Sequence, residues 1–520
     1  MRMLAAAAKS EQPSRSKQSY TTVAMTRREA FWHGFGWGCV AGLALVALMY
    51  LANAFLGLRP LPQLLNEPLL SLMPGFVFGF LIDTLQHAGK VVEELGLIVA
   101  MIVALGVLGG IASVASLRWT SQYLPFAFAA IGWIVTVAVL LPVGGAGPFG
   151  LNDGIVTPLI WAVLFAVYAV ILQFAAQPAP GVDAGRRRLL TTLPLSIAGF
   201  SVLALAYRLG PDWYNAVFSA PGSGLRGISP AITPVDSFYV VSKNFADPVV
   251  DGQAWKLRIA GMADKPATLT LADLRALPST TEYVTLECIS NDVGGPQIST
   301  GSFTGVPLAN LVEMASPQTQ ASWVAFSARD GYTESLALSM VRGHPEVLVA
   351  YDLNGAPLPS AHGYPARILI PGHYGMKGPK WLDTITLTNQ EARGYWEQQG
   401  WDHNAVVKTT SRIDTPQDGD IVKLGPLAIG GVAFGGTRGI SKVEYSTDAG
   451  SSWTEAPFDP PLSNLTWVVW RTTWTPPSEG AYRLVVRATD GSGGAQPNGS
   501  APSYPDGSSG YHTVQVNVSK

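Results

Sequence analysis

The sequence predicts a multidomain protein in which an α-helical membrane region is followed by a mixed α+β domain and an all-β, immunoglobulin-like sandwich. Most of the apolar excess lies before Gly210, short strands and helices alternate from Phe238 to about Leu387, and strand patterns alone continue from about Val406. A chain of 520 residues has room for about three or four such units. We expect a cytoplasmic tail over 1–30, the membrane region over 31–210, the mixed domain over 211–404 and the sandwich over 405–520.

Composition narrows the possible function classes. Only 13% of the residues are charged and the mean hydropathy is +0.23, and both values are unusual for a soluble protein. The formal net charge of −2, without a basic cluster in the soluble part, argues against a nucleic-acid binder. The two cysteines, Cys39 and Cys288, are too few for a disulfide framework or a cysteine-rich zinc or iron–sulfur site, and no Cys-x-x-Cys-His motif is present for a covalently attached haem.

Five segments are apolar enough to cross a bilayer, which takes roughly 20 residues. They are Phe35–Leu56, Leu95–Leu117, Leu124–Val143, Ile155–Phe174 and Leu190–Tyr207. A sixth stretch, Leu69–Leu85, carries Pro74, Asp83 and several glycines, so we interpret it as a re-entrant or interfacial piece.

The arginines predict the orientation of this region. In a five-helix topology, Arg27, Arg28, Arg118 and the run Arg186–Arg188 all fall on one side, which the Lys/Arg bias identifies as the cytoplasm. The loops on the other side would hold the acidic residues Glu67, Glu93, Glu94 and Asp153. We therefore expect a multi-pass protein of the cell membrane with its C-terminal domains outside the cytoplasm. A sixth helix would invert this agreement.

Two features of the membrane region bear on its role. The run Arg186-Arg187-Arg188-Leu189-Leu190 fits either a twin-arginine export signal or a plain positive-inside cluster. Ionisable residues are almost absent from the spans, and the only histidines are His33 near a helix end and His87 in a predicted loop. This pattern argues against a haem between the helices or an ion path. We expect the helices to anchor the protein or to dock a redox partner.

Local patterns assign the elements of the soluble half. We expect strands at Trp255–Ile259, Tyr283–Cys288 and Arg367–Ile370, short helices at Thr270–Leu277 and Leu308–Ala315, and later strands at Lys442–Ser446, Val468–Trp474 and Tyr482–Ala488. The later strands predict a sandwich of about seven strands. The Gly/Ser/Pro-rich stretch Gly491–Ser509 is expected to be a loop.

Cys288 stands where a functional thiol could be presented. It follows an apolar strand and precedes the glycine-containing loop Asn291–Gly295. Read alone, the position fits either a reactive or metal-binding thiolate or a small buried filler, which is the commoner role of a free cysteine.

Four segments in one order resemble the sulfite oxidase family. They are Thr285-Leu286-Glu287-Cys288-Ile289-Ser290-Asn291 with its Cys-x-x-Asn core, Ala350-Tyr351-Asp352-Leu353-Asn354-Gly355, His362-Gly363-Tyr364-Pro365-Ala366-Arg367, and Pro371-Gly372-His373-Tyr374-Gly375-Met376-Lys377-Gly378-Pro379-Lys380-Trp381-Leu382. The final domain, with Ser446-Thr447-Asp448-Ala449-Gly450-Ser451-Ser452-Trp453, resembles that family's dimerisation domain. The resemblance makes 211–404 a molybdopterin-binding catalytic domain and 405–520 a dimerisation domain.

The resemblance implies a molybdenum ion held by one pterin dithiolene and one cysteine thiolate. A soft thiolate ligand suits such a metal, and Cys288 becomes the metal ligand. The residues that match pterin-contacting positions are Ser242, Lys243, Asn244, Asp330, His362, Arg367, Gly378, Pro379 and Lys380. Lys377 and Lys380 could instead be a solvated surface pair, although their Gly- and Pro-rich loop argues against that.

Departures from the family pattern concern the substrate pocket. Asp292 follows the Cys-x-x-Asn where sulfite oxidases carry arginine, Phe245 stands at a histidine position, and Trp401 stands at the position of their active-site tyrosine. A sulfite dianion needs several converging cations. Because the pocket retains only Lys243, we expect a less charged substrate, with Lys243 and Trp401 shaping the pocket beside Cys288.

The sequence therefore predicts a molybdenum-cofactor oxidoreductase that performs two-electron, oxygen-atom-transfer-type chemistry on a small molecule. Its electrons would be exchanged with a separate carrier, such as a cytochrome or a quinone-linked protein, and it could form a homodimer through its last domain. The alternatives are a sulfite dehydrogenase proper, a non-enzymatic membrane assembly protein with a degenerate cofactor domain, and a transporter or sensor with a ligand-binding ectodomain. Retention of Cys288, His362, Arg367 and Lys380 argues against a degenerate site.

Overall fold

A computed structural model describes residues 25–71, 75–119, 121–176, 196, 199, 227–243 and 247–520, with residues 66, 67, 70, 71, 75–92, 175 and 176 described by their backbone alone. The predicted fifth membrane helix, Leu190–Tyr207, and the arginine run Arg186–Arg188 lie outside the described residues, apart from two helical positions.

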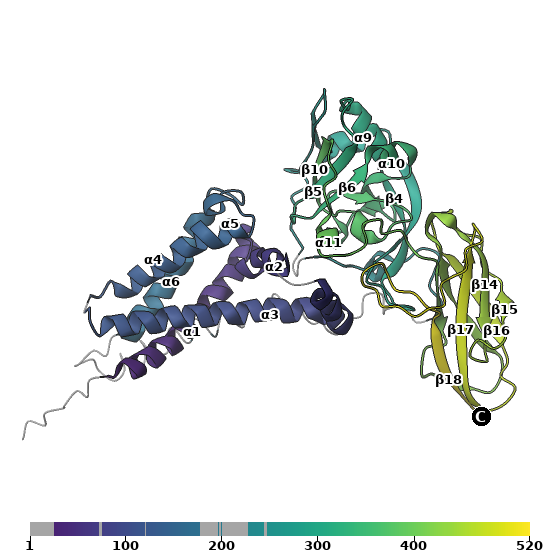
Figure 1. Cartoon of the computed structure of the whole chain (residues 1–520), viewed down its shortest axis with the longest axis horizontal. Helices are drawn as coiled ribbons and strands as arrows, with labels where there is room; N and C mark the ends of the chain where they lie inside the picture. The colour runs from purple at the N-terminus through teal and green to yellow at the C-terminus, as the bar shows by residue number, and fades with distance from the viewer. Residues whose placement is uncertain are drawn as a thin grey trace, which may run out of the picture. The chain divides into compact units, whose positions relative to one another are not determined.

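The N-terminal part of the described chain is helical (Figure 1). Its helices are α1 (Arg27–Leu56), α2 (Leu61–Ser71), α3 (Gly75–Ser116), α4 (Leu124–Val135), a π-helical turn (Thr136–Leu140), α5 (Leu141–Val143) and α6 (Thr157–Ala176). Four spans among them are long and apolar enough to cross a membrane: Arg27–Leu56, Glu93–Ser116, Leu124–Val143 and Thr157–Phe174. These spans agree with four of the five predicted segments.

Helix α3 differs from the expected loop. The prediction placed His87, Glu93 and Glu94 in a connection, but all three lie within α3, which runs for 42 residues. No proline interrupts the chain between Pro74 and Pro125, so nothing breaks the helix there. The stretch Leu69–Leu85 is accordingly divided between the end of α2 and the first turns of α3.

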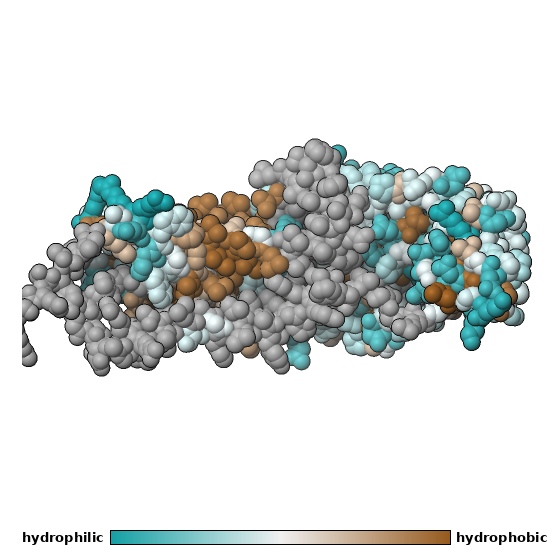
Figure 2. Space-filling model, turned by 90° about the horizontal axis from the view of Figure 1, so that it is seen from below, coloured by the Kyte–Doolittle hydropathy of each residue, from teal (hydrophilic) through white to brown (hydrophobic). Residues whose placement is uncertain are grey.

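The helices pack through small residues and present apolar side chains outward. A Cβ at Gly38 of α1 would lie 2.8 Å from the Leu105 carbonyl oxygen of α3, so the two backbones approach closely. Figure 2 shows apolar residues gathered over part of the helical region, whereas the visible surface of the β-rich part is mostly hydrophilic. Exposed large apolar residues of the helices include Val103, Val107, Ile111, Ile131, Leu159 and Val163. A surface of this kind suits hydrocarbon rather than water.

The mixed domain contains two five-stranded sheets. The first has the order β2-β1-β10-β5-β6, with strands β1 (Lys256–Gly261), β2 (Ala267–Thr270), β5 (Trp323–Ala328), β6 (Thr333–Ala337) and β10 (Leu382–Thr388). The second has the order β3-β4-β7-β8 with β9 paired to β7, and its strands are β3 (Thr280–Glu287), β4 (Ile298–Pro307), β7 (Leu348–Leu353), β8 (Ala356–Pro357) and β9 (Arg367–Leu369). Short helices complete the domain: α8 (Leu271–Ala276), α9 (Leu308–Met314), α10 (Leu338–Gly343) and α11 (Tyr395–Gln398).

Local chemistry explains where these elements begin and end. Thr270 caps α8 with a reciprocal capping box to Asp273, as the prediction of a helix from Thr270 requires. Strand β3 is exposed on alternate residues at its start and fully buried from Val284 to Glu287. The last residues of β3 therefore lead the chain into the interior immediately before Cys288.

The C-terminal domain is all-β. A three-stranded sheet has the order β11-β13-β16 and a five-stranded sheet the order β12-β18-β17-β14-β15. The strands are β11 (Thr410–Thr415), β12 (Ile421–Lys423), β13 (Leu427–Phe434), β14 (Ile440–Ser446), β15 (Thr454–Ala456), β16 (Val468–Trp474), β17 (Gly480–Asp490) and β18 (Thr513–Ser519). Residues from both sheets, among them Trp470 and Val486, share one buried core. These eight strands are close to the predicted number of about seven. The stretch Gly491–Ser509 contains no strand, as predicted.

Candidate active site

The loop after β3 is fixed by its own hydrogen bonds. The Cys288 amide donates to the Gln297 carbonyl (3.0 Å), and the Asn291 amide donates to the Cys288 carbonyl (3.0 Å). The Asn291 side chain accepts from the Gln297 amide (2.9 Å) and donates to Glu287 (3.0 Å). The Asn of the Cys-x-x-Asn motif therefore closes the loop that carries the thiol.

The Cys288 thiol is buried beside a polar side chain. It is 8% exposed, and its Sγ is 3.1 Å from Ser290 Oγ. Burial raises the pKa of the Tyr239 hydroxyl well above its ordinary value, with Cys288 adding to the rise and Arg367 opposing it. The structure therefore brings Cys288, Tyr239 and Arg367 together.

Arg367 is a buried cation with weak partners. Its guanidinium lies 3.4 Å from the His362 and Gly378 carbonyl oxygens and 3.5 Å from that of Ile368. Among the described residues, no carboxylate lies within ion-pairing distance of it, although the side chain is only 6% exposed. An unpaired buried charge is costly, so this position favours an anionic ligand.

His362 and Lys380 lie beside this arginine. Burial lowers the pKa of His362 to about 4, with smaller contributions from Arg367 and Lys380, so its imidazole is neutral at pH 7. Lys380 donates to Ser242 Oγ (2.6 Å) and to the Ala361 carbonyl (2.9 Å). Pro379, the remaining loop residue of the predicted set, accepts a hydrogen bond from the Ile368 amide at 2.9 Å.

Asp330 and Lys243 form another part of the candidate site. Burial raises the pKa of Asp330, while the nearby Lys243 and the Tyr332 amide lower it. The Lys243 ammonium lies 4.8 Å from the centre of the Tyr395 ring. Asn244, also predicted to contact the pterin, lies outside the described residues.

Trp401 is buried and has an unused donor. It packs edge-on against Tyr504 of the C-terminal domain, with ring centres 5.2 Å apart, and shares a cluster with Ile289 and Met376. Its indole Nε1 is buried and has no hydrogen-bond partner among the described atoms. Buried indole N–H groups normally have one, so this donor is available for a bound molecule.

The C-terminal domain supports the cysteine loop. Arg412 of β11 donates to the Gly295 carbonyl (2.7 Å), and Ser508 Oγ donates to the Asn291 carbonyl (2.7 Å). A Cβ at Gly294, which has φ +76°, would lie 2.0 Å from the His512 ring. Only glycine fits between the loop and that ring.

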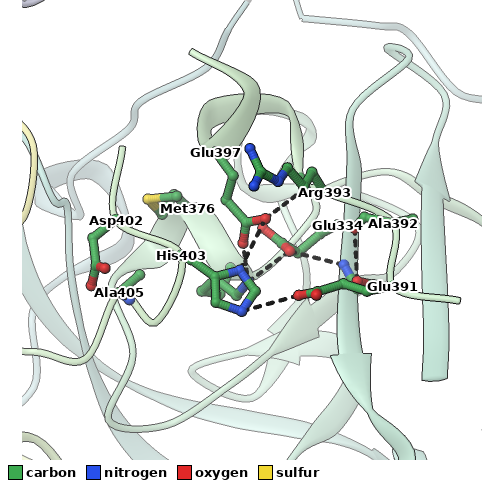
Figure 3. A network of polar contacts seen from close by, with 12 residues as sticks. Glu334, Met376, Glu391, Ala392, Arg393, Glu397, Asp402, His403 and Ala405 are labelled. Atoms are coloured by element: carbon green, nitrogen blue, oxygen red, sulfur yellow. Dashed lines mark hydrogen bonds and ion pairs between the residues drawn. The ribbon is translucent and has the colours of Figure 1, made fainter. Parts of the chain in front are cut away.

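The prediction missed a buried ionic cluster. Lys377 is 3% exposed and donates to Glu334 (2.7 Å) and Glu397 (2.5 Å), so the surface-pair alternative for Lys377 and Lys380 is wrong. Figure 3 shows the two carboxylates converging, with His403 and Glu391 next to them. The residue that could have indicated this cluster was Glu334, an acidic residue in the buried middle of a strand. The prediction also missed Tyr239, because an aromatic residue directly after Phe238 indicates a position in the hydrophobic core.

The donor set fits a molybdenum–pterin cofactor. In the described part of the chain, no group of three or more His, Cys, Asp or Glu side chains could hold a bare metal ion, so a metal bound by Cys288 would need ligands from a cofactor. The buried Arg367 suits the pterin's phosphate, and Lys380, His362 and Ser242 suit its phosphate or ring heteroatoms.

Comparisons with known families and proteins identify the proteins to which this chain is similar. The family model "Oxidoreductase molybdopterin binding domain" matches residues 244–396, and "Mo-co oxidoreductase dimerisation domain" matches residues 402–518. "Sulfite oxidase" of Arabidopsis thaliana is 30% identical over 279 residues, which cover 44% of this chain and 70% of that protein. "Sulfite oxidase, mitochondrial" of Mus musculus is 28% identical over 337 residues, which cover 55% of this chain and 62% of that protein.

A solved structure also resembles the chain. The sulfane dehydrogenase SoxCD of Paracoccus pantotrophus aligns with a TM-score of 0.49 and 22% identity, covering 58% of this chain and 86% of that chain. The chain spans less than two thirds of the mouse mitochondrial relative, and all the matched family regions lie after residue 243.

Proposed function

The chain belongs to the sulfite oxidase family of molybdopterin-dependent oxidoreductases, and from this premise we propose that it performs two-electron, oxygen-atom-transfer-type chemistry outside the cytoplasm. The observation that carries the site assignment is the buried, carboxylate-free Arg367 next to Cys288. When bound, the cofactor supplies a metal that accepts or returns two electrons.

The residues of the chain take the following roles in this proposal. Cys288 is the metal ligand, and the hydrogen bonds of Asn291 and Ser290 hold its loop and thiol in place. Arg367, Lys380 and His362 hold the anionic and polar parts of the pterin, with Ser242, Lys243, Asn244, Asp330, Gly378 and Pro379 completing its contacts. The neutral imidazole of His362 can donate one hydrogen bond and accept another.

The substrate is proposed to carry less charge than sulfite. Asp292, Phe245 and Trp401 depart from the sulfite oxidase pattern, and Lys243 is the one cation retained in the pocket. The Lys243 ammonium lies over the Tyr395 ring. Trp401 offers an uncharged N–H donor instead of a cation. A sulfite dehydrogenase is the second candidate, because the relatives named above are sulfite oxidases.

The remaining domains support the chemistry in this proposal. The apolar helices anchor the protein as a multi-pass membrane protein, with Arg27, Arg28 and Arg118 on the cytoplasmic side. The C-terminal domain, an immunoglobulin-like sandwich, mediates a homodimer, as its family model's name implies. A separate redox carrier exchanges electrons with the site, since the sequence has no haem or flavin motif.

The test is the metal content and turnover of the detergent-purified protein, with Cys288→Ala and, as a matched control, Cys39→Ala. We expect about one molybdenum per chain and full turnover in the wild type and in the control, because Cys39 lies in α1. Cys288→Ala should alter the metal's electron paramagnetic resonance signal and reduce turnover by about a thousandfold or more.

Two results would contradict the proposal. One is a wild-type protein without molybdenum when it is produced in a cell that makes the cofactor. The other is a Cys288→Ala variant with an unchanged metal signal. Turnover of sulfite beside uncharged oxygen-atom donors and acceptors then decides between the two substrate candidates.

A further inference from the structure

A row of ionisable side chains leads from the interior of the catalytic domain to its surface. Lys377 Nζ lies 2.7 Å from Glu334 Oε1 and 2.5 Å from Glu397 Oε1. The other oxygen of Glu397 is 3.4 Å from His403 Nδ1, and His403 Nε2 is 3.0 Å from Glu391 Oε1. Figure 3 shows His403 placed between Glu397 and Glu391.

Charging all the inner residues of this row at once would cost free energy, because they are buried. One ammonium lies between two carboxylates, and the three side chains are 4%, 0% and 3% exposed for Lys377, Glu334 and Glu397. Burial raises the pKa of Glu334 to about 8, despite the attraction of Lys377. Burial opposes ionisation of Glu397 too, but Lys377, the Gly394 amide and His403 hold its pKa below the ordinary value. The cluster therefore retains an exchangeable proton near neutral pH.

Tyr332 connects the inner end of the row with the surroundings of Cys288. Tyr332, two residues before Glu334, donates from its hydroxyl to the Met376 carbonyl (2.6 Å), which adjoins Lys377. Burial raises the pKa of Tyr332 well above the ordinary value, and Glu334, Asp330, Tyr395 and Cys288 are all close enough to add to the rise. Tyr332 is therefore close to both the cluster and Cys288. Glu334 Oε2 is buried without a hydrogen-bond partner among the described atoms, which leaves it free to bond a water molecule.

The outer end of the row reaches solvent. The His403 side chain is 52% exposed and Glu391 is 37% exposed. Histidine is the side chain that exchanges protons with water most readily near neutral pH. The neighbouring Asp402 is not part of the row, because its carboxylate accepts the Ala405 amide at 2.7 Å.

We propose that Glu334, Lys377, Glu397 and His403 form a proton-transfer path between the cofactor site and solvent. The inference rests on the proposed function, in which X + H₂O becomes XO + 2 H⁺ + 2 e⁻, the two electrons pass to the separate carrier, and the two protons must leave a buried site. In the reverse direction, two protons enter with the two electrons. Lys377 passes a proton by giving one to Glu397 and taking one from Glu334, and His403 exchanges it with water.

The path is tested by proton uptake when the cofactor-loaded protein is reduced. The probe is reduced methyl viologen, a one-electron donor that carries no protons, and a pH-indicating dye in weakly buffered solution records the uptake. His403→Ala is compared with His344→Ala, a matched control in which an equally exposed histidine (50%) pairs with Glu346 at 2.9 Å away from the row.

We expect the wild type and His344→Ala to take up protons as fast as they are reduced. His403→Ala should slow proton uptake by about tenfold or more, and added imidazole should restore the rate. Glu397→Gln and Lys377→Arg should slow uptake without rescue, because the block lies inside the protein and because a guanidinium does not give up its proton. Loss of a merely structural contact would not be repaired by imidazole.

The possible failures are distinguishable. If the wild type is reduced and takes up protons, but His403→Ala does so at the wild-type rate or is not rescued by imidazole, the path is wrong and the proposed function stands. If the wild type contains no molybdenum or is not reduced by the viologen, the proposed function and the path are both wrong. His403 is exposed, so its variant should fold, and thermal unfolding of each variant verifies this.

Discussion

The two β-rich domains treat buried charge in opposite ways. In the C-terminal domain, Asp490 accepts hydrogen bonds from Arg438 (2.8 Å), Thr409 (2.9 Å) and Ser492 (2.7 Å). In the catalytic domain, Arg367 contacts only carbonyl oxygens, at 3.4–3.5 Å, among the residues that the structure describes. Lys377 donates to two carboxylates. Asp490 is thus paired by residues of its own domain, whereas Arg367 has no described counter-ion and could be neutralised by a bound ligand.

The largest expected effect compares the same substitution in the two domains. Arg438→Met should destabilise the protein by about 2–3 kcal/mol, less than for a fully buried pair because Arg438 is partly exposed. Arg367→Met should leave the cofactor-free protein equally stable or stabilise it by about 1–4 kcal/mol, because the variant no longer buries an unpaired cation.

The measurement is urea unfolding of protein made in cells that lack cofactor synthesis. The same Arg367→Met variant, made with the cofactor, should retain less molybdenum than the wild type. Equal destabilisation by both substitutions would show that Arg367 is structural, and the contrast between the domains would disappear.

A second comparison measures how the stability of the two domains depends on pH. The folded pKa of Glu334 is about 8 against an ordinary value of 4.5, so the folded state retains a proton that the unfolded state releases. Stability should therefore fall by about 1.4 kcal/mol for each pH unit between those two values, and Glu334→Gln should remove the decline.

The pH dependence of stability that we expect from Asp490 has the opposite sign. Burial would raise its pKa, but hydrogen bonds from Ser492 and Arg438, among others, hold it well below the ordinary value of 3.8. Its stabilisation should be complete above that value and lost as the pH falls below it, and Asp490→Asn should remove this acid sensitivity. Denaturant unfolding between pH 3 and 9 measures both effects, and a Glu334→Gln curve parallel to the wild type would contradict the assignment of the proton.

The smallest expected effect tests the bond between the domains. Ser508→Ala removes the hydrogen bond to the Asn291 carbonyl and should cost about 1 kcal/mol, with a few-fold loss of turnover and unchanged molybdenum content. Ser509→Ala is the matched control, because its hydroxyl bonds Gly499 within the exposed part of the same loop. If both variants behave alike, the C-terminal domain does not position the cysteine loop.

The sequence could predict those features that depend on neighbouring residues. The apolar run before Cys288 predicted a strand that ends at the thiol, and β3 ends at Glu287. The order of four motifs placed Arg367, His362 and Lys380 in one site, and the structure brings these three residues together.

Features that depend on distant residues could not be predicted. The Lys377 cluster joins residues 43 and 20 positions away, and no local pattern identifies such partners. The acidic pair Glu93 and Glu94 marked a loop by its charge, but helix propensity continues through it because no helix breaker intervenes. The orphan indole of Trp401 depends on its contact with Tyr504, which belongs to another domain.

The supports of the cysteine loop have a consequence for inheritance. The two family models meet between residues 396 and 402, yet Arg412, Ser508 and His512 all contact the loop that carries Cys288. Recombination at that boundary would exchange three supports of the loop without altering the catalytic domain itself. Selection should therefore keep the two domains together as one heritable unit, with compensating changes on both sides of the boundary.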